Sequence, residues 1–172
     1  MVRPALFALT GISFFAFWAL ARPAFEATAT QQDWPIVLWF SATLLTLAVS
    51  LPAFGRLVGG RTVIRLALIA GLGIGLSSVA NIIEDGLQLD WAFFGFILGT
   101  LIMHVCLLAL TVVIAFTGQG MGRFLALIPA GTFLGVTFFV AAGGIILLVT
   151  WLVAAAASVA RERTTIFAAR RG

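Results

Sequence analysis

The segment TVIRLALIAGLGIGLSSVANII, residues 62–83, decides the fold class of this chain, and Arg65 is its single charged residue. An uninterrupted apolar run of this length matches the ~20 residues that an α-helix needs to cross the hydrocarbon core of a bilayer. Residues 92–116, AFFGFILGTLIMHVCLLALTVVIAF, repeat the pattern without a carboxylate, arginine or lysine. Only the short stretch EDGLQLDW (84–91) joins the two runs. The sequence therefore predicts an antiparallel hairpin of two transmembrane helices.

The rest of the chain continues this pattern. It is 62% hydrophobic and 9% charged over 172 residues, with a mean hydropathy of +1.18, which leaves too little polar surface to coat a water-soluble domain. Further apolar runs occupy 5–22, 34–53 and 124–160. The last run is too long for one ordinary span and barely long enough for two. Gly143-Gly144 lies near its middle and would permit a tight turn, because glycine tolerates a positive φ.

We therefore expect an all-α fold: a polytopic transmembrane helical bundle of six spans, arranged as three helical hairpins. The bundle would form a single domain over 1–160, followed by a short basic tail over 161–172. The alternative has five spans, the last one long and tilted.

The distribution of arginine favours six spans. The chain has ten arginines and no lysine, and cytoplasmic loops are enriched in such residues. Six spans with the N-terminus inside place nine of the ten in the cytoplasm, whereas five spans divide them evenly. Four spans plus a re-entrant hairpin also satisfy the rule, because they too keep the C-terminus inside. The nine are Arg3, Arg56, Arg61, Arg65, Arg123, Arg161, Arg163, Arg170 and Arg171. The sequence thus predicts a multi-pass protein of the cell (inner) membrane with both termini cytoplasmic.

The same charges exclude one class of partner and explain the position of the carboxylates. The arginines mark the ends of apolar runs and form no basic face, so nucleic-acid binding is not indicated. Most of the acidic residues then fall in outer loops, a placement that requires no function. They are Glu26, Asp33, Glu84, Asp85 and Asp90.

A polar stripe runs along the helix predicted over 62–83. At 100° per residue, its members fall within an arc of about 80°. They are Gly73, Ser77, Asn81, Glu84 and Gln88. Such a stripe should face another helix or a water-filled vestibule. Gly71 and Gly75 lie on a different face and form a small-xxx-small pair, which predicts close packing against a second neighbouring helix.

His104 is the strongest single signal in the sequence. It shares an arc of about 40° with Thr100 and Thr111 near the middle of its run. An ionisable group at that depth is a functional hypothesis: a proton relay, a metal or tetrapyrrole ligand, or a group that recognises a ligand. The alternative is a neutral imidazole bonded to a hydroxyl at the same depth, for which Ser13, Thr43 and Thr46 are candidates. About 18 Å separates His104 from the level of Glu84, so these two residues should not pair.

Other signals are weaker. The motif spacings typical of zinc sites do not occur, so no metal site is predicted and the identity of any cofactor stays open. Glu84 and Asp85 are adjacent and would point about 100° apart on a helix, so no catalytic pair is indicated. The basic tail is expected either to touch anionic lipid headgroups at the cytoplasmic face or simply to anchor that end inside, at about 1 kcal/mol per arginine. Its residues are Arg161, Arg163, Arg170 and Arg171.

Three functional hypotheses follow. We favour a non-catalytic integral membrane protein, an accessory or scaffold subunit that binds other membrane chains or itself. The first alternative is a small transporter or channel with an outward vestibule of Ser77, Asn81 and Glu84 leading to His104. The second is an intramembrane cofactor-binding protein that uses His104. No catalytic residue is predicted.

Overall fold

The computed structural model describes residues 2–27 and 34–169, and the side chains of 3–21, 34–120 and 122–163. Every regular element within them is helical, as expected. Six α-helices are joined in part by π and 3₁₀ turns: α1 (Val2–Ala27), α2 (Trp34–Val58), α3 (Arg61–Asn81), a π-helical turn (Ile82–Gly86), a 3₁₀ turn (Asp90–Ala92), α4 (Phe93–Thr117), a 3₁₀ segment (Gly120–Ala126), α5 (Leu127–Thr137), a second π turn (Phe139–Gly143) and α6 (Gly144–Ala169).

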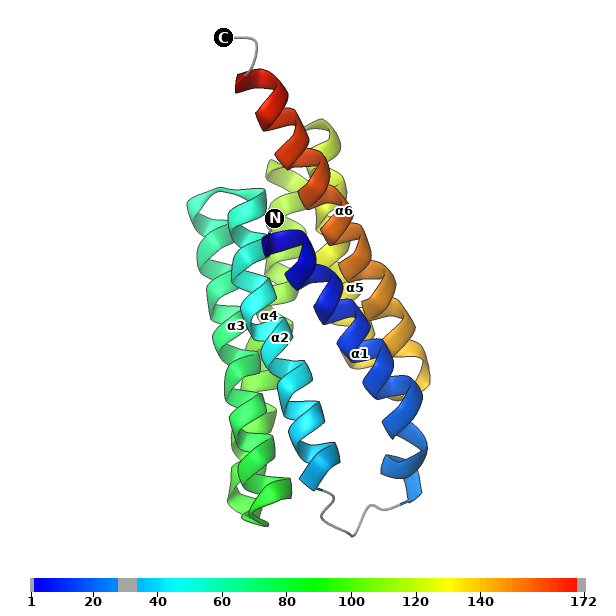
Figure 1. Cartoon of the computed structure of the whole chain (residues 1–172). Helices are drawn as coiled ribbons and strands as arrows, with labels where there is room; N and C mark the ends of the chain where they lie inside the picture. The colour runs from blue at the N-terminus through cyan, green and yellow to red at the C-terminus, as the bar shows by residue number, and fades with distance from the viewer. Residues whose placement is uncertain (1, 28–33, 170–172) are drawn as a thin grey trace.

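The prediction of a helical membrane bundle is confirmed. Five segments are long and apolar enough to cross a membrane, namely Arg3–Ala21, Trp34–Val58, Arg61–Gly86, Asp90–Thr117 and Phe139–Arg163. The sixth apolar helix, Gly122–Thr137, is shorter. At 1.5 Å per residue it is about 24 Å long, which is less than the ~30 Å hydrocarbon core. The helix α6 that follows it is long and tilted, and the start of α1 and the end of α6 lie at the same end of the bundle (Figure 1). We call this the terminal end and the opposite one the distal end.

The turn between α5 and α6 differs from the expected one. The chain reverses at Phe138, whose carbonyl accepts hydrogen bonds from the amides of Ala142 and Gly143 at 3.1 and 2.9 Å. Neither Gly143 nor Gly144 has a positive φ, so the expected reason for the glycine pair was wrong. Both glycines instead permit close packing: a Cβ on Gly143 would overlap the carbonyl oxygen of Gly135, and one on Gly144 would overlap Trp18.

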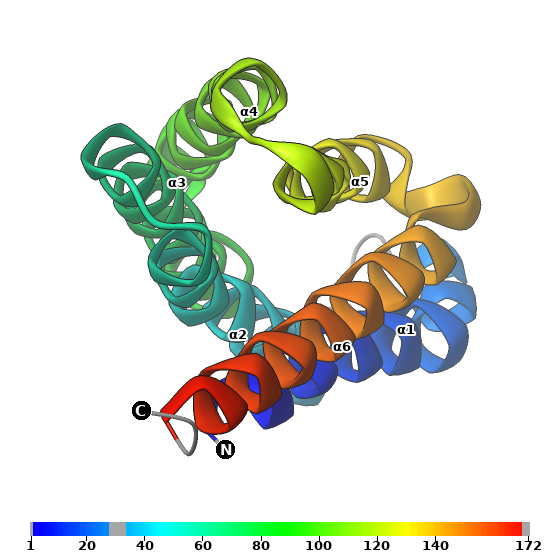
Figure 2. The same cartoon turned by 90° about the horizontal axis from the view of Figure 1, so that it is seen from above.

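The helices form a ring when the bundle is seen from above, with α3 between α2 and α4 (Figure 2). The most extensive helix contacts are α3 with α4, α2 with α3, and α1 with α6. The α3–α4 hairpin is therefore tight, as predicted, while α1 packs more against α6 than against α2. Phe7 of α1 stacks at a tilt on Trp151 of α6, with ring centroids 5.5 Å apart. This pairing of the first and last helices closes the ring.

Proline and glycine together fix the contact between α2 and α3. The helix α2 continues through Pro52 to Val58 and does not end at 53 as expected. Pro52 has no N–H, so the carbonyl of Ala48 loses its partner within the helix. Gly71 of α3 packs at this point, where a Cβ would lie 2.6 Å from the Ala48 oxygen. The predicted close packing at Gly71 is thus observed, whereas the nearest atom to a Cβ on Gly75 is 3.9 Å away.

A second close contact, between α3 and α4, generates a prediction. A Cβ on Gly99 would overlap the Gly73 carbonyl oxygen and lie 2.5 Å from Ser77 Oγ. We expect Gly99→Ala to lower the free energy of unfolding by roughly 1–3 kcal/mol, because a backbone carbonyl cannot move aside cheaply. The measurement is the midpoint of thermal unfolding in detergent, followed by circular dichroism. Gly75→Ala is the matched control and should leave the midpoint unchanged; equal midpoints for the two variants would contradict the assigned packing.

Candidate functional site

A cavity of about 370 Å³ lies inside the ring, between the middle of the bundle and its distal end. The helices α1 to α5 and the turn before α6 all contribute to it. Its lining consists of Phe14, Phe40, Leu44, Ile74, Phe96, Thr100, His104, Val136, Thr137 and Phe139. Apolar side chains form most of the surface, while the polar residues lie on α4 and α5. The cavity is thus a largely apolar chamber with a few polar groups on one side.

His104 is held in a defined tautomer by the backbone of its own helix. Its Nδ1 lies 2.7 Å from the carbonyl oxygen of Thr100, one turn earlier. A carbonyl oxygen can only accept, so Nδ1 must carry the proton, and Nε2 of the neutral ring is then an acceptor. The imidazole also contacts Phe133 edge-on, with ring centroids 5.1 Å apart. The helix and this ring together hold Nε2 in place at the cavity.

The side-chain partner of His104 is Thr137 of α5, whose Oγ1 lies 3.2 Å from Nε2. The same hydroxyl lies 2.8 Å from the carbonyl oxygen of Phe133. Because a hydroxyl has one proton, Thr137 has two acceptors to choose between. The expected partners on α2 were wrong: the hydroxyls of Thr43 and Thr46 donate to carbonyls of their own helix, at 2.9 and 2.7 Å.

Thr100 and Ser77 join the site to the α3–α4 contact. Ser77 is fully buried, and its Oγ lies 3.0 Å from the Phe96 carbonyl and 3.1 Å from Thr100 Oγ1. The structure therefore brings Ser77, Thr100 and His104 together, as the stripe and the hairpin implied. Thr111, the third residue predicted on this face of α4, donates to the carbonyl of Leu107 and does not line the cavity.

Asn81 faces a different helix from Ser77. Its Nδ2 donates to Ser41 Oγ of α2 at 3.0 Å, and Ser78 donates to the Ser41 carbonyl at 2.8 Å. Both Asn81 and Ser78 are buried. Bonds of this kind between membrane helices contribute about 0.6–2 kcal/mol each. The polar stripe is thus divided between two helix interfaces.

The acidic end of the stripe lies in a π turn that continues α3 and in the connection after it. The π turn over Ile82–Gly86, closed by a 3.1 Å bond from the Leu87 amide to the Ile82 carbonyl, changes the angular step before Glu84. Gln88 has a φ of 56° and donates to the Asp85 carbonyl at 3.1 Å. The expectation that Gln88 continues the stripe of Ser77 was therefore wrong, because it assumed that the α-helix runs unbroken to residue 88.

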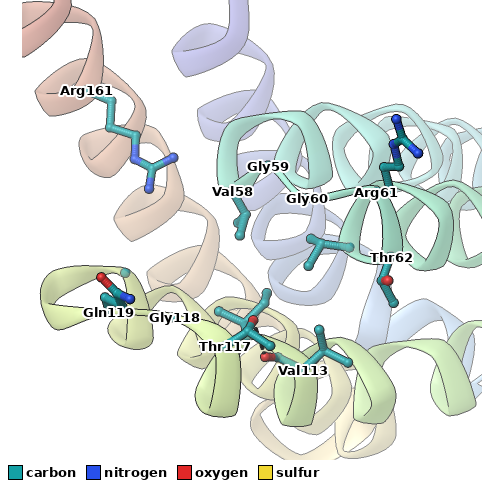
Figure 3. Close-up of a pocket in the computed structure, with 13 residues that line it drawn as sticks. Val58, Gly59, Gly60, Arg61, Thr62, Val113, Thr117, Gly118, Gln119 and Arg161 are labelled. Carbon is teal, nitrogen blue, oxygen red and sulfur yellow. Dashed lines mark hydrogen bonds between the residues drawn. The ribbon is translucent and has the colours of Figure 1, made fainter.

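The arginines within 161–172 were predicted to form a short basic tail. Arg161 instead extends from α6 toward the end of α2, where its Nη1 donates to the carbonyl of Leu57 (Figure 3). Arg163, two residues further along α6, is exposed. Arg170 and Arg171 lie outside the described residues. The side chains of Arg22 and Glu26, and Asp33 as a whole, are outside them as well.

Several residues of the cavity carried no signal in the sequence. Phe14, Phe40 and Phe139 are three of 16 phenylalanines, and phenylalanine is equally common where a helix faces lipid, so residue type could not distinguish them. Thr137 lies in the long last apolar run, 124–160, and the sequence did not place the turn of that run beside it. Over the described residues, no group of three His, Cys, Asp or Glu side chains could hold a metal ion.

Comparisons with protein-family models, with curated proteins and with solved structures found no match. The function of the cavity is therefore inferred from its own geometry.

Proposed function

We propose that this integral membrane protein is non-catalytic and binds a lipophilic small molecule with a hydroxyl group in the cavity beside His104. The observation that carries the proposal is a fixed acceptor, His104 Nε2, at the edge of an otherwise apolar cavity. This proposal keeps the non-catalytic class that the sequence favoured. It also develops the intramembrane binding role of His104.

The size and lining of the cavity suit such a ligand. Its volume of about 370 Å³ falls in the ~300–1,000 Å³ range of small-molecule sites, which are mostly apolar with a few fixed polar groups. Three phenylalanines cluster in its wall: the Phe139 ring centroid lies 6.0 Å from that of Phe14 and 6.3 Å from that of Phe40. Aromatic rings at such distances pack well against a planar ring.

The hydrogen-bonding groups select a donor over an acceptor. Nε2 can accept a hydrogen bond from a ligand hydroxyl, while Thr137 donates its own hydrogen bond to the Phe133 carbonyl, 2.8 Å away. No buried donor is left without a partner in this exchange, so the large cost of an orphaned group is avoided. A ligand carbonyl would have no comparable donor at Nε2.

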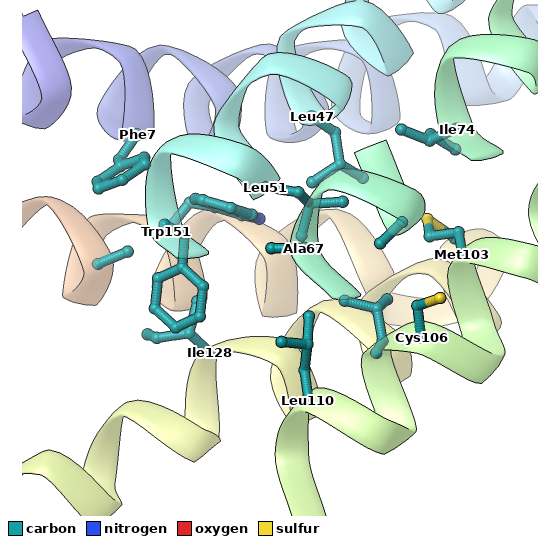
Figure 4. Close-up of a cluster of buried hydrophobic side chains, with 14 of the residues drawn as sticks. Phe7, Leu47, Leu51, Ala67, Ile74, Met103, Cys106, Leu110, Ile128 and Trp151 are labelled. Atoms are coloured by element: carbon teal, nitrogen blue, oxygen red, sulfur yellow. The ribbon is translucent and has the colours of Figure 1, made fainter. Parts of the chain in front are cut away.

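A transport pathway has less support. Ser77 and Asn81, which would line its vestibule, are buried in contacts between helices. A cluster of buried apolar side chains, including Leu47, Met103 and Trp151, packs between the helices of the bundle (Figure 4). A pathway should have polar groups that face it at every depth, whereas the buried hydroxyls of Thr10 and Ser50 bond to each other at 2.7 Å in the contact between α1 and α2.

Ligand binding is tested with 1-naphthol and naphthalene, which differ by one hydroxyl. We expect the wild-type protein in detergent to bind 1-naphthol more tightly than naphthalene by calorimetric titration. His104→Leu should weaken 1-naphthol binding roughly tenfold, the equivalent of one hydrogen bond of about 1.4 kcal/mol, and should leave naphthalene binding unchanged.

Thr111→Val is the matched control, since it removes a hydroxyl from the same face of α4 outside the cavity. Its affinity for 1-naphthol should equal that of the wild type. Equal binding of 1-naphthol by His104→Leu and wild type would contradict the proposal. So would wild-type protein that binds neither compound.

Association with other membrane chains, or with itself, is the second part of the proposed role and follows the accessory-subunit hypothesis. The surface of α4 that such a chain would contact carries exposed apolar side chains, such as Leu101, Val105 and Val112, against which lipid tails and another helix pack equally well. We expect the protein, solubilised from its native membrane in mild detergent, to elute in a particle larger than its 18.2 kDa chain plus a micelle. Elution as a lone monomer would contradict this part.

We further propose that both termini face the cytoplasm of the inner membrane. Arginines gather at the terminal end, and Glu84, Asp85 and Asp90 lie in the connection at the distal end. The arginines are Arg3, Arg56, Arg61, Arg65, Arg123, Arg161 and Arg163. This separation of charge supports the orientation, since arginine-rich loops stay inside.

Orientation is tested by cysteine labelling in a Cys106→Ala background. An impermeant maleimide on intact cells should label Leu87→Cys, at the exposed distal connection, and should not label Gln119→Cys at the terminal end. Lysed cells, in which both variants should react, are the control. The reverse pattern on intact cells would contradict the proposed orientation.

A further inference from the structure

A second cavity, of about 490 Å³, lies at the terminal end (Figure 3). The end of α2, the start of α3, the end of α4 and the side of α6 surround it. Its lining residues are Val58, Gly59, Gly60, Arg61, Thr62, Val63, Val113, Ile114, Thr117, Gly118, Gln119, Gly122 and Arg161. It is separate from the cavity beside His104, with which it shares no residue.

The position and lining of this cavity suit an amphiphile. Three candidate spans end or begin at it: one ends at Val58, one begins at Arg61 and one ends at Thr117. Lipid headgroups lie where the apolar spans stop. Toward the membrane interior the lining is apolar, with Val63, Val113 and Ile114, whereas the polar lining residues include Thr62, Thr117 and Gln119.

The charged residues of the lining are all cations. Arg161 and Arg61 come from elements a hundred residues apart, and none of the described lining residues is acidic. Arg161 reaches into the space from α6, while the guanidinium of Arg61 points to the outer side of the α2–α3 turn (Figure 3). The bond from Arg161 to the Leu57 carbonyl orients its guanidinium at the cavity. A guanidinium has five N–H donors in a planar fork that matches phosphate oxygens.

The backbone of the α2–α3 turn adds to this preference. Gly59 and Gly60 have φ values of 87° and 84°, and a Cβ at either would meet nothing within 4 Å. No side chain caps the start of α3, so the first amides of that helix lack partners within it. Such amides favour an anion. They reinforce a site whose charge comes from Arg161 on a different helix.

We propose that this cavity binds the phosphodiester headgroup of an anionic phospholipid. The guanidinium of Arg161 holds the phosphate, the hydroxyl of Thr62 and the first turn of α3 donate to it, and the apolar floor takes the glycerol end of the acyl chains. This goes beyond a general attraction of the basic end to lipid, because it assigns one defined site. It does not depend on the ligand proposed for the His104 cavity.

The test uses the full chain, delipidated in a neutral detergent and titrated with dioleoylphosphatidylglycerol in mixed micelles. The readout is the rise in the midpoint of thermal unfolding. We expect the lipid to stabilise the wild type and its apparent affinity to fall roughly tenfold in Arg161→Gln, the loss expected when a charge-assisted hydrogen bond is removed. Arg163→Gln, at an exposed position two residues along the same helix, is the matched control and should bind as the wild type does.

Thr62→Val is a second probe and leaves the bond from Arg161 to Leu57 intact. If Arg161→Gln does not fold, Thr62→Val tests the site alone, and we expect its affinity for the lipid to be reduced. If Arg161→Gln and Arg163→Gln lower the affinity for the lipid equally, the lipid is held by general electrostatic attraction to the basic end, and the proposal is overturned. Unchanged affinity in both Arg161→Gln and Thr62→Val would overturn it as well.

Two further arms separate the sources of phosphate. Inorganic phosphate at millimolar concentration should stabilise the wild type little, since it lacks a part for the apolar floor. If inorganic phosphate stabilises the protein as much as the lipid does, the ligand of this cavity is a free anion, and the proposal of a phospholipid is overturned. Dioleoylphosphatidylcholine, which has the same phosphodiester but no net charge, should stabilise less than the anionic lipid; equal stabilisation would overturn the preference for an anionic headgroup.

Discussion

The close approach of α3 to both of its neighbours is the constraint on which the rest of this structure depends. Lipid tails are as apolar as leucine, so helices in a bilayer gain no hydrophobic drive to associate and rely on tight packing and hydrogen bonds. Gly71 lets α3 meet the α2 carbonyl that Pro52 leaves unpaired, and Gly73 lets it meet Gly99 of α4. Two glycines only two residues apart, on opposite faces of α3, thus place one helix directly against two backbones.

Once α3 is held at this distance, its polar side chains must find partners across the same interfaces, because no water is present to receive them. Ser77 reaches α4 and Asn81 reaches α2 for this reason. These contacts bury the polar stripe that would otherwise line a passage. They also set the rotation of α4, and with it the position of His104 on the inner side of the ring.

The two cavities arise where the ring is not filled. At the distal end, α5 is too short to span the bilayer, and Phe14, Phe40 and Phe139 surround a space in the middle of the ring. At the terminal end, Gly59 and Gly60 form the tight turn between α2 and α3. Because glycine has no side chain, this turn leaves the space beside the end of α4 open. The distal chamber presents the acceptor Nε2 of His104, and the terminal cavity presents the guanidinium of Arg161. The two ends of the molecule therefore suit ligands of opposite character.

The sequence by itself determined the fold class, the boundaries of α3 and α4 to within a few residues, and the hairpin between them. These follow from the length of apolar runs against the thickness of a bilayer and from short connections, which are local properties. Only the tertiary structure decided that Thr137 is the partner of His104, that Asn81 turns to α2, and that Arg161 joins the end of α2. Those contacts depend on the relative depth and rotation of helices far apart in the chain, and glycine contacts and a π turn set both without any periodic signal.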